Sequence, residues 1–408
     1  MNQSFFGRKV VAAAFATALF GWGIGFYGPP IFLYYVIQRT DWTVQLCSAA
    51  VTVHFLSGTL VVVNLPRLYK RFGLPRITTL GSVLLCLGVY GWSIAAEPSQ
   101  LFIAATLSGL GWVTLGAAAI NAIIAPWFVT MRPAALAMAY NGASVGGVVF
   151  SFAWVYLINY LGFPQAALLI GVLTISVTAF LSLRVFGIYP EDIGQHADGV
   201  KVRPAEPVTL SPTSTKPLLS NPQFVTLAIG MSLGLFAQIG LIAHIFLLLV
   251  PALTEQQAGL AMGLATGSAI AGRALVSRLM PVNANRRTVA CICYACQLVG
   301  CLMMSGLDIH PSMVWVGIVM FGAGIGNATS LPPLIAQIEF PRDQTQRVIT
   351  LIVATSQGCY AFAPALFGVL KSLADGSAPA GLLFGFAAIL QAAAIVILTL
   401  GTHSTRRT

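Results

Sequence analysis

One arginine, Arg273, stands inside a long apolar stretch that contains no acidic residue. A guanidinium keeps its proton in proteins, so burial in hydrocarbon is costly unless an anion lies beside it. Its planar fork suits bidentate binding of a carboxylate. We therefore interpret Arg273 as the centre of a site for an anionic ligand. The alternative is that Arg273 extends toward the membrane surface or bonds to helix carbonyl groups as a gating contact.

Two histidines, His244 and His54, are the only ones within apolar stretches. Histidine gains or loses a proton near neutral pH, so both are candidates for proton coupling. By helical rise, Arg273 lies about 7 Å to one side of the middle of its stretch and His244 about 10 Å to the other side. Direct contact between these two side chains is therefore not expected unless one helix breaks.

Uncharged polar residues in the apolar stretches are further candidates for ligand contacts. Amide and phenol groups at mid-depth suit a small polar ligand, although each alone more often packs or bonds between helices. These candidates are Tyr27, Tyr34, Asn121, Gln238, Asn327, Gln357 and Tyr360.

The elements that position these residues are long apolar segments. The chain is 57% hydrophobic and 8% charged, and a run of about 18 apolar residues is long enough to cross a bilayer. We predict twelve transmembrane helices and an all-α polytopic membrane protein. The predicted spans are 10–37, 44–66, 76–97, 100–125, 134–160, 164–188, 224–251, 256–280, 288–306, 312–335, 346–371 and 378–401.

The net charge of +10 reflects orientation rather than nucleic-acid binding. If the N-terminus is cytoplasmic, all but three of the Lys and Arg residues fall on the cytoplasmic side, which is the positive-inside pattern. We expect both termini in the cytoplasm and a location in the cell (inner) membrane. The basic residues on that side are Arg8, Lys9, Arg67, Lys70, Arg71, Arg76, Arg132, Arg184, Lys201, Arg203, Lys216, Arg278, Arg286, Arg287, Arg342, Arg347, Arg406 and Arg407.

The sequence offers no pattern for catalysis or for a cofactor. Phosphate-loop, zinc-protease and nucleophile-elbow motifs are absent. Cys291, Cys293 and Cys296 cluster in the ninth span, where thiols behave as small apolar residues, although soft-metal binding is the alternative. We therefore predict neither enzymatic activity nor a cofactor.

A polar, proline-rich segment divides the chain into halves. We assign residues 1–188 to an N-terminal six-helix bundle, 189–222 to a cytoplasmic linker and 223–408 to a C-terminal six-helix bundle. A weak repeat supports the division, because Arg67 and Arg76 align with Arg278 and Arg287 at one offset. Such duplicated halves are typical of secondary transporters. Glycines 21–28 and 322–326, each followed by a Pro-Pro pair, predict bends in spans one and ten.

Several motifs resemble those of the major facilitator superfamily. The stretch Arg67-Leu68-Tyr69-Lys70-Arg71-Phe72-Gly73-Leu74-Pro75-Arg76 is similar to its signature loop, with Pro66 in place of the first Gly and Lys70 in place of the Asp. Three further motifs resemble the monocarboxylate and oxalate/formate porter branch of this superfamily. They are Trp127-Phe128 with Arg132 and Asn141-Gly142, Pro190-Glu191-Asp192-Ile193-Gly194 with Asp198-Gly199, and Gly272-Arg273.

The resemblance implies two six-helix bundles around a central cavity and roles for individual residues. It implies that Arg273 binds a substrate carboxylate, and that Asn141 braces Arg273 or touches the ligand, unless Asn141 is a packing amide beside Gly142 and Gly146. It favours His244 for proton coupling and pairs His54 with Gln357. Gating roles are implied for Arg67, Lys70, Arg71, Gly73 and Arg278, with the contacts of Lys70 altered by the lost Asp.

We predict a secondary active transporter of a small organic anion, a mono- or dicarboxylate, that works as a proton symporter or an anion exchanger. The expected partners are the anion, the lipid bilayer, and protons or a counter-anion; the resemblance implies a monomer. The alternatives are efflux of drug-like, metallophore or other hydrophobic compounds and, in a different class, a membrane sensor that does not transport.

Overall fold

The computed structural model describes residues 5–199, 218–281, 284–305, 311–328, 331–373 and 379–404, and every regular element in these ranges is a helix. The predicted all-α class is confirmed. Five basic residues that entered the orientation prediction, and most of the predicted linker, lie outside the described residues. They are Lys201, Arg203, Lys216, Arg406 and Arg407, and linker residues 200–217.

Among the described residues, eleven helical segments are long and apolar enough to span a bilayer, and a bent pair of helices makes a twelfth when it is counted as one span. This agrees with the twelve predicted spans. The first six spans comprise α1 (Gly7–Gly25) with α2 (Gly28–Thr40), α3 (Val44–Phe72), α4 (Leu74–Ile94), α5 (Pro98–Trp112) with α6 (Ala117–Ile124), α7 (Arg132–Leu161) and α8 (Phe163–Leu181). The last six comprise α9 (Pro222–Leu249), α10 (Glu255–Leu279), α11 (Arg286–Ser305), α12 (Pro311–Ala328) with α13 (Leu331–Glu339), α14 (Arg342–Tyr360) with α15 (Ala363–Leu373), and α16 (Pro379–Ser404).

The bends predicted from glycine and proline are confirmed. Span one is interrupted between α1 and α2, and α12 and α13 meet at an angle of 45°. Proline has no N–H for the helix ladder, so a Pro-Pro pair is tolerated where a new helix begins. Two further interruptions, between α5 and α6 and between α14 and α15, were not predicted.

The chain forms two compact units. Unit 1 contains residues 1–42 and 53–207, and unit 2 contains Thr43–Thr52 with 208–408. The predicted division placed all of residues 1–188 in the first bundle, whereas the structure groups the start of α3 with the second. Within unit 2, the Ala365 N–H donates to the Thr52 hydroxyl at 3.0 Å.

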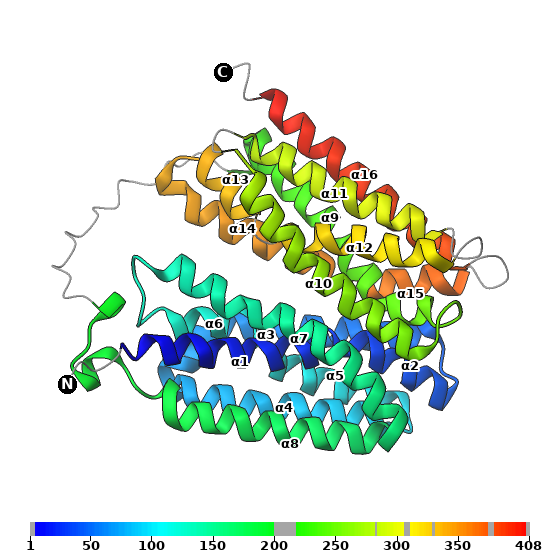
Figure 1. Ribbon diagram of the computed structural model, residues 1–408, viewed down its shortest axis with the longest axis horizontal. Coiled ribbons are helices and arrows are strands. Elements are labelled where there is room, and N and C mark those ends of the chain that lie inside the picture. The colour runs from blue at the N-terminus through cyan, green and yellow to red at the C-terminus, as the bar shows by residue number, and fades with distance from the viewer. Residues whose placement is uncertain are drawn as a thin grey trace. The chain divides into compact units, whose positions relative to one another are not determined.

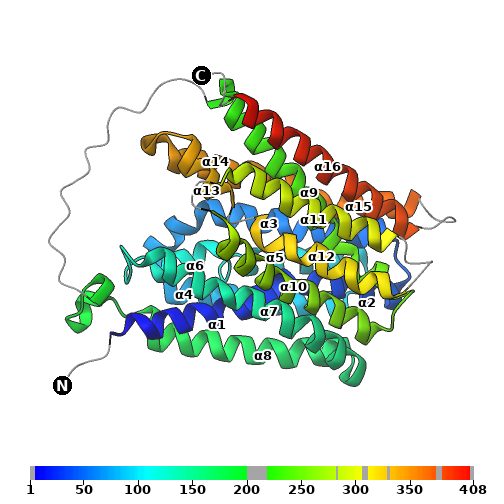
Figure 2. The ribbon, with the colours of Figure 1, turned by 45° about the horizontal axis from the view of Figure 1, so that its top comes forward.

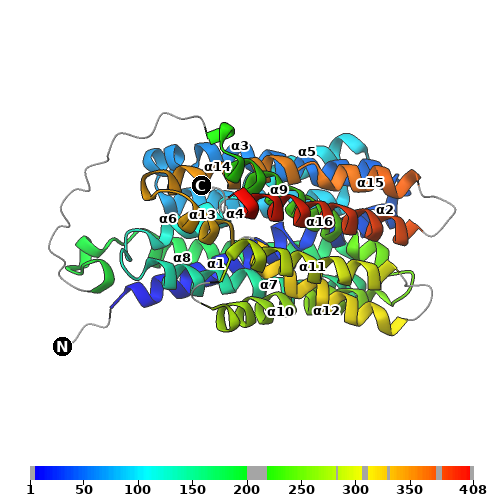
Figure 3. The same cartoon turned by 90° about the horizontal axis from the view of Figure 1, so that it is seen from above.

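Corresponding spans pack in the same pairs in both units. In unit 1, α1 lies along α7, and α4 contacts α5 and α8 (Figures 1 and 2). In unit 2, α9 lies along α14, and α11 contacts α12 and α16 (Figure 3). Spans one and five therefore correspond to spans seven and eleven, as the weak sequence repeat indicates.

Small residues bring the backbones of paired helices close together. A Cβ atom added at Gly142 or Gly146 of α7 would lie 2.0 or 2.3 Å from the carbonyl oxygens of Phe15 and Leu19 in α1. Larger side chains at these two positions would push the helices apart. The glycine pair of span five is thus a helix-packing surface of the small-xxx-small kind.

The first residues of the predicted linker are folded onto unit 1. We call residues 189–199 the strap; it contains the short helices η2 (Pro190–Ile193) and η3 (Ala197–Gly199). The Asp198 carboxylate accepts the backbone N–H groups of Thr130 at 2.7 Å and Met131 at 3.2 Å, just before α7. The Gln195 amide oxygen accepts the N–H of Phe6 at 2.9 Å. The strap therefore ties the start of α1 to the start of α7.

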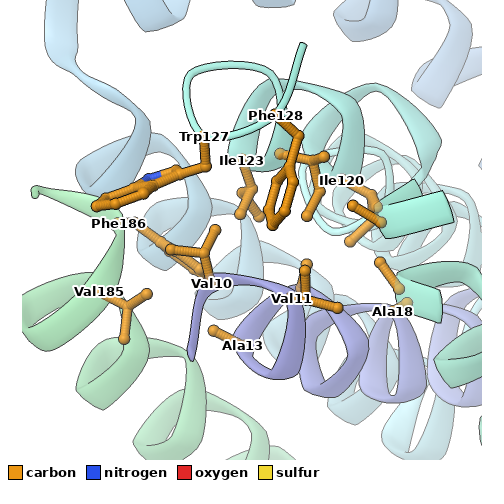
Figure 4. Close-up of a cluster of buried hydrophobic side chains, with 14 of the residues drawn as sticks. Val10, Val11, Ala13, Ala18, Ile120, Ile123, Trp127, Phe128, Val185 and Phe186 are labelled. Atoms are coloured by element: carbon orange, nitrogen blue, oxygen red, sulfur yellow. The ribbon is translucent and has the colours of Figure 1, made fainter. Parts of the chain in front are cut away.

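An aromatic cluster lies beneath the strap. Trp127, Ile123 and Phe186 gather around Val10 of α1 (Figure 4). The Trp127 carbonyl accepts the Asp198 N–H at 2.9 Å, so the strap and the cluster form one assembly. Composition alone described this segment as polar linker, because its anchoring depends on bonds to residues far away in the sequence.

Hydrogen bonds to Asp198 give the strap a defined pH dependence. Partial burial alone would raise the pKa of the Asp198 carboxyl. Hydrogen bonds from the N–H groups of Thr130, Met131 and Val129 together have the larger, opposite effect, so this pKa lies below its ordinary value. A lowered folded-state pKa means that the stabilisation is fully present above the ordinary carboxyl pKa and is lost as pH falls through the lowered one.

We expect Asp198→Ala to expose the amides of residues 129–131. A hydrogen bond to a charged acceptor contributes about 1.5 kcal/mol, so hydrogen–deuterium exchange there should accelerate about tenfold in the variant. In the wild type, protection should be retained at both pH 7 and pH 5. Glu191→Ala, which removes an exposed carboxyl from the same strap, is the control; equal exchange in both variants would contradict the assignment.

Unit 2 contains a buried ion pair that the sequence did not predict. Arg287 is fully buried, and its Nε and Nη2 atoms donate to the two Glu339 carboxylate oxygens at 2.7 and 2.8 Å. Nη2 also donates to the Gln223 carbonyl at 2.7 Å and Nη1 to the Thr226 hydroxyl at 3.0 Å. One guanidinium thereby joins α11, α13 and α9.

We expect this pair to be essential for the stability of unit 2. Removing one partner of a buried pair costs about 3–5 kcal/mol, whereas replacing both by apolar residues is often neutral. Glu339→Gln should therefore lower the melting temperature followed by circular dichroism, and Arg287→Met combined with Glu339→Leu should recover most of the loss. Arg278→Met, at an exposed position of α10, should change little. No loss in Glu339→Gln would show that the pair is dispensable.

Candidate functional site

Arg273 lies where α10 packs against the end of α12. Its side chain is partly buried, and Nε donates to the Gly326 carbonyl at 2.9 Å. Of the contacts proposed from the sequence, the bond to a helix carbonyl is therefore present. It attaches the guanidinium to α12 two residues before that helix ends, next to the 45° bend.

Close helix packing brings Arg273 to this carbonyl. A Cβ atom at Gly272 would lie 2.1 Å from the Ala323 carbonyl oxygen, and one at Gly326 would lie 2.2 Å from that of Ala269. The two backbones are in contact, so an arginine on this face of α10 reaches the α12 backbone. The residue after Gly326 is Asn327, which is buried.

Charge is also buried outside the predicted spans. The sequence interpretation concerned the apolar spans, where Arg273 was the one charged side chain well inside and no carboxylate was found. In the structure, Arg287 is the fully buried arginine and Glu339 is its partner. The sequence signal was weak, because Glu339 follows its span by a few residues and resembles a surface charge.

The cysteines of the ninth span belong to the core of unit 2. Cys291 and Cys293 are buried among apolar side chains of α9, α11 and α13. Among the described residues, no group of three His, Cys, Asp or Glu side chains is arranged to hold a metal.

In unit 1, Asn121 and Tyr140 form a polar cluster beside Asn141. The Asn121 Nδ2 donates to the Tyr140 hydroxyl at 2.7 Å, and that hydroxyl donates to the Ala117 carbonyl at 3.2 Å. Trp22 packs edge-on against the Tyr140 ring at 6.1 Å. Asn141 itself is exposed on α7. Sequence reasoning selected Asn121 and Asn141 but missed Tyr140, whose position next to Asn141 was the available signal.

His244 is completely buried in unit 2. Its Nδ1 lies 2.9 Å from the Gly240 carbonyl and must donate, so in the neutral ring Nε2 accepts the hydroxyl of Ser48 at 2.8 Å. The ring stacks on Phe367. Because His244 bonds to Ser48 and Gly240 while Arg273 bonds to Gly326, the two side chains have different partners, as the depth argument predicts.

His54 is also buried and fully hydrogen-bonded, but not to the predicted residue. Its Nδ1 lies 2.8 Å from the Ser108 hydroxyl and its Nε2 lies 2.9 Å from the Gly25 carbonyl. The predicted hydrogen bond to Gln357 is therefore wrong. The sequence predicted that the His54 ring is hydrogen-bonded. The identity of its partners depends on how α3 packs against α5 and on the position of the carbonyl at the end of α1.

The other predicted ligand contacts are distributed over both units. Tyr34 of α2 is buried and its ring packs edge-on against Tyr35 at 5.2 Å. Gln357 and Tyr360 of α14 are partly buried. Within unit 2, Arg273 lies on α10, which packs against α12, the helix that carries Asn327.

The predicted gating residues surround the turn between α3 and α4, with one at the end of α10. Arg67, Lys70, Arg71 and Arg278 are exposed. Gly73 has a φ of +82° and precedes α4, a conformation that glycine adopts without strain. Lys70 forms no ion pair with the residues that the structure describes.

We expect His54 to be structural. His54→Ala removes both hydrogen bonds and the stacking on Trp112, which should lower the melting temperature by leaving buried polar groups unsatisfied. His54→Gln, which restores a donor and an acceptor, should recover part of the loss. Protein that folds should keep the wild-type pH profile of transport; a shifted profile would assign His54 to proton coupling instead.

Comparisons with known proteins agree on one family. Residues 13–364 match the sequence profile of the Major Facilitator Superfamily. The MFS-type transporter 1 of Ophiocordyceps sp. (strain BCC 1869) is 29% identical over 163 residues, which are 39% of this chain and 35% of that protein. The match thus spans about a third of the relative's length.

Solved transporter structures share the fold at low sequence identity. A bacterial homolog of the human lysosomal transporter Spinster, in an inward-facing and occupied conformation, superposes with a TM-score of 0.72 at 14% identity, over 98% of both chains. The nucleoside transporter NupG superposes with a TM-score of 0.70 at 10% identity, over 97% of this chain and 99% of that one. At such identities the likeness shows the fold alone.

Proposed function

This chain belongs to the major facilitator superfamily and is a multi-pass membrane transport protein, not an enzyme; we propose that it carries a small organic anion. The proposed substrate is a mono- or dicarboxylate, moved by alternating access. The fold is shared by a homolog of a lysosomal transporter and by a nucleoside transporter, so the proposal depends on this chain's own side chains.

The observation that carries the proposal is the position of Arg273. Its Nε is fixed on the Gly326 carbonyl at the bend of span ten, which orients the planar guanidinium before a ligand arrives. A guanidinium held in this way suits a carboxylate and discriminates against cationic compounds. Because the same side chain is attached to α12, anion binding and movement of the bend are physically linked.

Two uncharged residues of unit 1 remain proposed ligand contacts. They are Asn141, which is exposed on α7, and Asn121, whose side-chain amide donates to the Tyr140 hydroxyl. Coupling is proposed to come from a proton carried by His244 or from a counter-anion. We further propose that the protein is a monomer in the cell (inner) membrane. Both termini are proposed to lie in the cytoplasm, because exposed Arg8, Lys70 and Arg278 lie at span ends on the same predicted side.

We expect Arg273→Lys to lose most transport. Lysine keeps the charge but not the planar fork, and loss of a charge-assisted bidentate contact should reduce counterflow in proteoliposomes at least tenfold. Arg184→Lys, the same exchange at an exposed position, should retain wild-type counterflow. Near-normal uptake by folded Arg273→Lys would contradict the proposed role.

We expect small carboxylates to raise the melting temperature of the wild type at millimolar concentration. A ligand that binds the native state stabilises it by mass action. The same compounds should have no effect on Arg273→Ala. Stabilisation by uncharged hydrophobic compounds and by no carboxylate would favour the alternative of efflux.

We expect His244→Gln to separate coupling from translocation. Counterflow moves no net proton, so it should persist in this variant, whereas uptake driven by an imposed pH gradient should fail. Ser48→Ala, which removes the donor to Nε2, should weaken gradient-driven uptake less. Wild-type protein that ignores the pH gradient but exchanges labelled carboxylate would identify a counter-anion as the coupling species.

A further inference from the structure

Unit 1 contains a cavity that no part of the proposed transport site uses. Its volume is about 140 Å³, and it lies beneath the strap, where α1, α3, α4 and α6 end or begin. Its wall includes Val10, Tyr69, Ile123, Trp127, Phe186 and Tyr189. These residues come from six segments, and Tyr189 is the strap residue among them.

The chemistry of the wall defines what fits. No charged side chain lines the cavity, and most of its wall is aliphatic or aromatic, so a charged ligand would lose its hydration without compensation. A protein cavity of about 150 Å³ lined by apolar side chains accepts a benzene-sized molecule. The size and lining therefore suit one uncharged ring.

One polar atom in the wall is unsatisfied. The Tyr69 hydroxyl is buried and has no hydrogen-bond partner among the described residues. Leaving a buried donor unpaired is unfavourable, and a ligand with an acceptor removes that cost. Tyr69 lies in the stretch Arg67–Arg76, and Tyr189 on the same wall belongs to the strap. A molecule in the cavity therefore contacts both the stretch and the strap.

We propose that this cavity is a binding site for a small uncharged single-ring compound with one hydrogen-bond acceptor, such as a phenol. The ring occupies the space between Val10, Ile123, Trp127 and Phe186, and its oxygen accepts the Tyr69 hydroxyl. The occupant braces the end of α3 against the strap. It is distinct from the transported anion, because it is uncharged and none of the proposed ligand contacts lines this cavity.

The test compares two matched probes, 4-fluorophenol and fluorobenzene, by ¹⁹F NMR titration of the purified full-length protein. Both should bind saturably to the wild type, with 4-fluorophenol about fivefold tighter because fluorobenzene has no oxygen for Tyr69. In Tyr69→Phe, which keeps the ring, the ratio of the two dissociation constants should fall to about one.

Variants that fill the cavity complete the test. Ala122 lines the cavity, so Ala122→Phe should abolish saturable binding of both probes. Ala12→Phe, at an exposed position of α1, should leave it unchanged. Unaltered binding in Ala122→Phe, or a probe ratio in Tyr69→Phe equal to that of the wild type, would overturn the proposal. Because Tyr69→Phe is nearly isosteric, its result remains decisive if Ala122→Phe fails to fold.

Discussion

The backbone contact between α10 and α12 is the constraint on which the candidate site depends. Gly272 and Gly326 bring the two helices close enough for carbonyl oxygens to fill the space that a Cβ atom would take. In a bilayer, where lipid is as apolar as the helices, such close packing is a main source of association. This packing places the Arg273 Nε beside the Gly326 carbonyl. It thereby attaches Arg273, the residue proposed to bind the anion, to the bent span ten.

Two arginines in unit 2 show how local partners decide what a buried charge does. Arg287 is surrounded by a carboxylate, a hydroxyl and a main-chain carbonyl, and its charge is balanced within the protein. It serves to hold helix ends together. Arg273 is partly buried and bonds to a neutral carbonyl. The bond to Gly326 fixes the orientation of the Arg273 guanidinium, which suits the proposed role in ligand binding.

The corresponding end of unit 1 is held together by different chemistry. Arg76, which aligns with Arg287, is exposed. In place of an ion pair, unit 1 has the aromatic cluster around Val10 and the strap, anchored by Asp198 on three backbone N–H groups. Duplicated halves can therefore keep the same helix packing while the groups that close one end diverge, since packing depends on small residues and closure on a few polar side chains.

Local patterns in the sequence determined the helical class, the number of spans, the bends before Pro29 and Pro332, and the separate partners of His244 and Arg273. Each depends on apolar length, proline geometry or helical rise, which neighbouring residues set. Only the tertiary structure decided the partners of His54, the burial of Arg287 with Glu339, the Asn121–Tyr140 pair and the folding of the strap. These contacts join residues far apart in the chain. Side-chain hydrogen bonds act over about 3 Å, and which groups come that close is fixed by how the helices pack.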